Sequence, residues 1–99
     1  MNIVESEYIQ FEELSIRLPE LRVHLRGKEI NVTLTQLRLL TILVSDPYGH
    51  FTSEELIRRL QLPSRPALAV LITNVRELLG QKYIVTLHGF GYAFTVEKA

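Results

Sequence analysis

Residues 66–96 read PALAVLITNVRELLGQKYIVTLHGFGYAFTV, and within them the spacing of the apolar side chains changes from helical to extended. From Pro66 to Leu79 apolar residues recur every three or four positions, as on a helix with one buried face. Proline suits the first turn of such a helix, and Gly80 suits the position after its last turn. Beyond this glycine, residues 83–96 form two apolar segments around a glycine-containing turn, which predicts a β-hairpin.

Two more helices are predicted upstream, and each opens with the Thr-x-x-Gln/Glu pattern of a capping box. In this motif the threonine hydroxyl accepts from the amide three residues on, and the side chain at that position reaches back to the threonine amide. Thr33 and Gln36 open the first helix. Thr52 and Glu55 open the second, which runs through about Leu60. A short connection then leads into the 66–79 helix.

Ahead of the first helix, apolar and polar residues alternate, which is the period of a strand with one buried face. The predicted strands are residues 8–11, 14–18, 21–25 and 30–32. The polar, acidic residues 1–7 are predicted to be a tail or the end of a linker, and residues 8–99 a single domain. Strands, three helices and a closing hairpin predict an α+β fold, namely a winged helix-turn-helix with an N-terminal antiparallel sheet.

Composition excludes several classes of protein. Eleven Lys and Arg balance eleven Asp and Glu, so bulk charge cannot drive polyanion binding, although a local patch still could. The chain has no cysteine, which excludes a disulfide scaffold, a thiolate metal site and a cysteine nucleophile. The longest apolar runs are far shorter than the ~18 residues that span a bilayer. The start is acidic where a signal peptide would be basic, so a cytoplasmic location is predicted.

The residues that could carry catalysis or bind a metal are not arranged for it. The three histidines have no second histidine or carboxylate at metal-ligand spacing in a favourable element. The adjacent glutamates at 12–13 and 54–55 do not face each other on a helix and point to opposite faces of a strand. Gly89 and Gly91 lead into a strand, whereas a phosphate loop leads into a helix. We therefore predict no enzyme activity, no metal and no cofactor.

The candidate binding surface is the side of the 66–79 helix opposite its apolar stripe. As the second helix of a helix-turn-helix, this helix would place that side in the DNA major groove, and the hairpin would lie along the backbone. The candidate base-facing residues are Val70, Thr73, Asn74 and Glu77. The basic residues nearby are Arg58, Arg59, Arg65, Arg76 and Lys82. Because the base-facing set has no cation, a winged helix repurposed for protein contact stands as the alternative function.

Four segments resemble the effector domain of OmpR/PhoB-type response regulators, which are winged-helix transcription factors with an N-terminal four-stranded sheet. Residues 32–40 are similar to the start of that family's first helix, and residues 51–56 to the start of its second. Residues 72–76, ITNVR, resemble its Ile-x-x-Leu-Arg recognition-helix segment. Residues 84–92, IVTLHGFGY, resemble its Ile-x-Thr-Val-Arg-Gly-x-Gly-Tyr wing, which is the most specific of these matches.

The resemblance implies a bacterial two-component regulator domain that binds double-stranded DNA in a sequence-specific way. Thr73 and Asn74 would then face bases. The residues expected at the DNA backbone are Thr52, Ser53, Arg58, Arg65, Arg76, Thr86 and His88. The family also implies RNA polymerase as a further partner. Because few cations lie on the expected contact surface, a second copy of the chain on repeated half-sites could supply the missing affinity. This chain differs from the family at Ala69, Leu71 and Ala93, where Asp, His and a basic residue are common.

Overall fold

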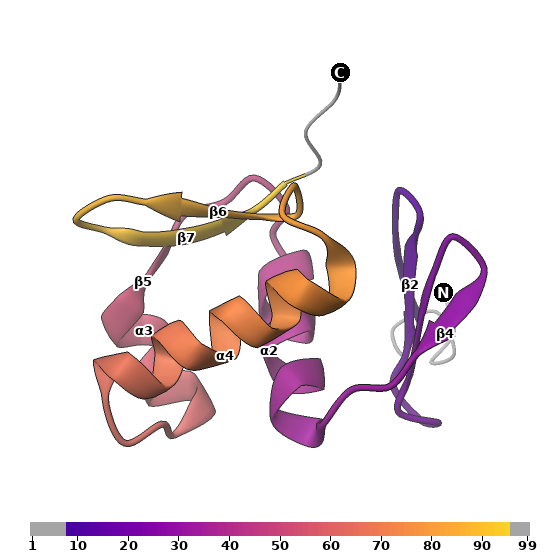
Figure 1. The fold of residues 1–99 in the computed structure, drawn as a ribbon, viewed down its shortest axis with the longest axis horizontal. Helices are drawn as coiled ribbons and strands as arrows, with labels where there is room; N and C mark the ends of the chain where they lie inside the picture. The colour runs from indigo at the N-terminus through magenta and orange to yellow at the C-terminus, as the bar shows by residue number, and fades with distance from the viewer. Residues whose placement is uncertain (1–7, 96–99) are drawn as a thin grey trace.

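The computed structural model describes residues 8–95, and it opens with a four-stranded antiparallel sheet (Figure 1). Its strands follow chain order: β1 (Tyr8–Phe11), β2 (Leu14–Arg17), β3 (Arg22–Leu25) and β4 (Lys28–Ile30). Alternate side chains of β2 and β3 are buried, and those between them face outward, as their period of two predicts. The predicted tail, residues 1–7, and the end of the predicted hairpin, residue 96, lie outside the described residues.

Three helices follow: α2 (Leu34–Val44), α3 (Ser53–Leu60) and α4 (Arg65–Leu79). The capping box of α2 is complete, because Thr33 and Gln36 bond each other's backbone amides. At α3 the Thr52 hydroxyl accepts from the Glu55 amide, but the Glu55 carboxylate pairs with Arg59 instead of reaching back. The structure therefore has only one half of the second predicted box.

The helix α4 begins one residue earlier than its sequence predicts. Ser64 is its N-cap, and the serine hydroxyl accepts from the Ala67 amide. Pro66 occupies the first turn and Gly80 follows the last residue, as predicted. The glycine has a φ of 105°, which side-chain-bearing residues rarely adopt.

The closing hairpin is β6 (Ile84–Leu87) and β7 (Gly91–Phe94), and a short strand that the sequence did not reveal joins it. This strand, β5 (Phe51–Thr52), pairs with β7 on the side away from β6. A strand of two residues is too short to show an alternating pattern in the sequence, so β5 is recognised only by its pairing with β7. Gly91 permits the pairing, because a Cβ at this position would collide with the Phe51 carbonyl oxygen.

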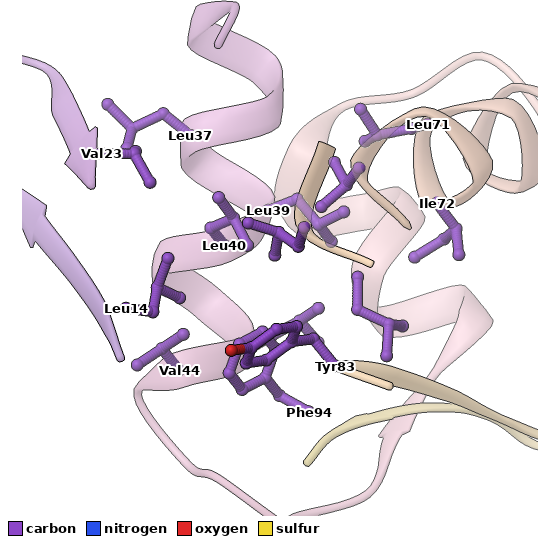
Figure 2. Close-up of a cluster of buried hydrophobic side chains, with 14 of the residues drawn as sticks. Leu14, Val23, Leu37, Leu39, Leu40, Val44, Leu71, Ile72, Tyr83 and Phe94 are labelled. Carbon is purple, nitrogen blue, oxygen red and sulfur yellow. The ribbon is translucent and has the colours of Figure 1, made fainter. Parts of the chain in front are cut away.

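The core forms around α2, which lies between the N-terminal sheet and the remaining elements (Figure 1). Leu39, Leu40 and Leu43 of α2 are fully buried. Figure 2 shows sheet residues such as Val23 on one side of this helix and Ile72 of α4 on the other. A single apolar core thus holds α3, α4 and the hairpin in one arrangement.

Candidate nucleic-acid interface

The helix α4 has one buried face and one exposed face, as predicted. Leu68, Ile72, Val75 and Leu79 point into the core, each at most 5% exposed. The four residues predicted to face bases, Val70, Thr73, Asn74 and Glu77, are all exposed. Their spacing of three, four and seven positions places them on one face of the helix. The fold therefore leaves this face open to a partner.

The wing is attached to α4 through Arg76. The Nε of this residue donates to the Ile84 carbonyl at 3.0 Å, and its Nη2 donates to the Thr86 hydroxyl at 2.6 Å. Arg76 and Thr86, both expected at the DNA backbone, are thus bonded to each other and partly buried. This contact sets the position of the hairpin beside the exposed face of α4.

The tip of the wing reaches the beginning of α3. The Ser53 amide donates to the Phe90 carbonyl at 3.2 Å, and the His50 ring meets the Phe90 ring edge-on at 6.0 Å between centroids. The Thr52 hydroxyl is bonded to the Glu55 amide, as described above. The polar groups that Thr52 and Ser53 would offer to a phosphate are therefore partly satisfied within the protein. His88, at the same tip, is exposed.

Two of the cations around α3 and α4 form ion pairs with carboxylates. Arg65, the first residue of α4, forms an ion pair with Glu54 in the first turn of α3. Arg59 pairs with Glu55 at 3.4 Å within α3. Arg58 is exposed in the last turn of α3. The surface around α3 and α4 therefore combines positive groups with nearby acids.

A hollow beside α4 brings Asn31, which the sequence did not single out, together with residues that it did. It lies between α4 and the link from β4 to α2, and is lined on one side by Asn74 and Glu77. Asn31 and Gln36 line the other side. These residues are separated by about forty positions in the chain, so no local pattern could have revealed that they lie together.

Two features needed for other functions are missing from residues 8–95. Within this range no helix is long and apolar enough to cross a membrane. The same residues include no group of three His, Cys, Asp or Glu side chains placed to hold a metal ion.

An exposed helix beside a hairpin, preceded by two packed helices, defines a winged helix-turn-helix domain of transcription regulators. The chain belongs to the family "Transcriptional regulatory protein, C terminal", whose model matches residues 27–94. A probable transcriptional regulatory protein of Picosynechococcus is 31% identical over 94 residues, which cover 86% of this chain and 38% of that protein.

Solved structures show the same fold. The response regulator DrrB of Thermotoga maritima, an OmpR/PhoB homologue, has a TM-score of 0.82 and 25% identity over 90% of this chain and 44% of its own. The DNA-binding domain of Klebsiella pneumoniae RstA, solved with the RstA box, has a TM-score of 0.81 and 21% identity over 90% of this chain and 97% of its own. The chain thus spans less than half of the length of DrrB and of the Picosynechococcus relative.

Proposed function

We propose that residues 8–99 form the DNA-binding effector domain of a bacterial transcription regulator, with α4 in the major groove of a specific duplex and the β6–β7 wing on its backbone. The observation that carries this proposal is the exposed face of α4, beside which Arg76 holds the wing. RstA and AdeR domains of the same fold have been solved with DNA, which supports DNA binding by this chain. Protein contact, the alternative suggested by the uncharged face, is not favoured by these relatives.

The four exposed side chains of α4 suit contact with base edges. An asparagine such as Asn74 can bond adenine through two atoms, and Glu77 can accept from the amino group of cytosine. Val70 offers an apolar contact for a thymine methyl group, and Thr73 can bond any base. Backbone contacts then fall to groups around this face, of which Arg58 and His88 are exposed.

A single domain would bind weakly. Each neutralised phosphate adds to a salt-dependent affinity, and specific binders often make ~6–10 such contacts. This surface offers few free cations, so two copies on repeated half-sites would supply the remaining affinity. Because the proposed target is DNA, we also propose that the domain acts in the bacterial cytoplasm. RNA polymerase is a further partner that we propose for the whole regulator.

The test begins with selection of bound sequences from a randomised duplex pool at low salt. We expect a recurrent sequence to emerge, with affinity for it that falls steeply as salt is added. Asn74→Ala should then change base preference at one position, at a cost of about 1–3 kcal/mol. Arg58→Ala should weaken all sequences alike. A pool that stays random, or an unchanged base preference in the Asn74 variant, would remove α4 from the interface.

A further inference from the structure

The two helices of the helix-turn-helix are joined by an ion pair at the ends where each begins. Glu54 lies in the first turn of α3, and Arg65 is the first residue of α4. Their carboxylate and guanidinium are in direct contact. Both side chains remain about two-thirds exposed, at 65% and 66%. In Figure 1 these helix ends lie on the same side of the molecule as the wing tip, away from the N-terminal sheet.

An exposed ion pair of this kind is weak and open to competition, because water and salt screen it. A DNA phosphate is the anion that Arg65 would meet if α4 enters a major groove. Glu54 occupies the guanidinium before the DNA arrives, so the phosphate has to displace a carboxylate. Within α3, Glu55 forms a second ion pair of this kind with Arg59.

We propose that Glu54 is a specificity-determining residue, which acts as an internal competitor for the phosphate that would otherwise bind Arg65. The inference rests on the proposed function and deepens it. On a random sequence no base contact holds the duplex in register, and the carboxylate keeps the guanidinium. On the correct sequence the base contacts present a phosphate at a fixed place and at high effective concentration, and the phosphate takes over. Glu54 thus suppresses sequence-independent binding more than specific binding.

The test uses Glu54→Gln, which keeps the shape of the side chain and removes its charge. Binding to a mixed-sequence duplex of twenty base pairs is measured by fluorescence anisotropy across a salt series. Because an exposed ion pair is a weak competitor, its removal should raise the affinity by up to about fivefold at ~50 mM salt. The slope of log affinity against log salt should steepen by up to about 0.9, the value for one added phosphate contact. The ratio of affinities for the selected and the mixed duplex should fall.

Glu20→Gln is the matched control, because it changes the net charge equally at an exposed turn of the N-terminal sheet. It should leave affinity and slope nearly unchanged. Arg65→Gln provides the second arm, since Glu54→Gln should have no effect on binding when the guanidinium is already absent. Thermal unfolding of each variant checks that the exposed substitutions leave the fold intact.

Two results would overturn the inference. One is equal behaviour of the Glu54 and Glu20 variants, which would mean that only bulk charge matters. The other is a gain that persists in the Arg65→Gln background, which would mean that Glu54 repels DNA directly. Either result leaves the proposed function standing if the wild-type chain binds its selected duplex. Failure of the wild type and of every variant to bind any duplex defeats both proposals.

Discussion

Arg76 of α4 and Thr86 of β6 are bonded at 2.6 Å, and this contact holds α4 and the wing in one fixed relation. The same guanidinium also donates to the Ile84 carbonyl, so one side chain is bonded to two residues of β6, Ile84 and Thr86. A duplex that meets the exposed face of α4 therefore meets the wing at a set distance.

Thr86→Val tests this attachment, because it removes the hydroxyl and keeps the branched shape. We expect a loss of about 1–2 kcal/mol in the free energy of unfolding, since the acceptor of a charged donor is removed from a partly buried site. Urea denaturation measures this loss. Thr73→Val makes the same chemical change on the exposed face of α4 and should cost less than about 0.5 kcal/mol. Equal losses would show that the Arg76 contact contributes nothing.

Gly91→Ala tests the pairing of β5 with β7. The added Cβ would collide with the Phe51 carbonyl oxygen and lie 2.8 Å from the Thr52 Cα, so the two strands must separate. We expect a loss of about 2–3 kcal/mol or more in the free energy of unfolding, as for other overpacked sites. Gly27→Ala is the control, because its Cβ meets open space and only the positive φ is strained, at a cost of about 1 kcal/mol. A Gly91 variant as stable as the Gly27 variant contradicts the proposed collision.

Tyr83→Phe tests a buried hydroxyl, which Figure 2 shows in the core near Phe94. Within the described part of the chain this hydroxyl has no hydrogen-bond partner in bonding geometry, although the charge of Glu13 acts on it. Burial first, and then Glu13, raise the pKa of Tyr83 above its ordinary value of about 10. The folded chain therefore holds this proton more tightly than the unfolded chain.

It follows that the wild type loses stability as the pH rises from about 10 toward the folded pKa, because only the unfolded chain then releases the proton. The Tyr83→Phe variant has no phenolic proton at this position, so its stability should fall less as the pH rises. At neutral pH it should be as stable as the wild type or more stable, because an unpartnered buried hydroxyl costs free energy. Urea denaturation at pH 8 and near pH 11 compares the two chains. An identical alkaline slope in both would contradict the raised pKa.

Thr33→Ala tests the one complete capping box. Loss of the hydroxyl that accepts from the Gln36 amide should destabilise the chain by about 1 kcal/mol. For a domain of this size, that corresponds to a drop of roughly 4–8 °C in Tm. Thr35→Ala is the control, because Thr35 lies two residues further along the chain, inside α2, and is not the residue that caps the helix. A Tm that falls equally in both variants would contradict the role of the cap.

The helices and the two faces of α4 could be predicted from the sequence because their signals are local. The period of three to four residues between Leu68 and Leu79 already separated the buried side from the side that carries Asn74. Thr33 with Gln36 marked the start of α2 within four residues. The wing was readable from its glycines and from its resemblance to a known family.

Local patterns could not predict the strand β5. They also could not predict which carboxylate each arginine would pair with. Thr52 with Glu55 looked like a complete box, but Arg59, one turn further along α3, takes the carboxylate. Arg65 looked like a free cation, but α3 brings Glu54 to it from eleven residues away. Asn31 lines the same hollow as Asn74 only because the fold brings two distant segments of the chain together.

The three helices, their buried stripes, the N-terminal strands, the closing hairpin and the family follow from the amino-acid sequence alone, because these depend on spacing and motifs within a few residues. Which polar groups remain free for a partner depends on the folded arrangement of the chain. A hydrogen bond or ion pair between distant residues requires the folded core to bring them together, and this is why Arg76 and Arg65 prove to be engaged. The free energy of such contacts depends on distance in space, which alternation and capping patterns do not encode.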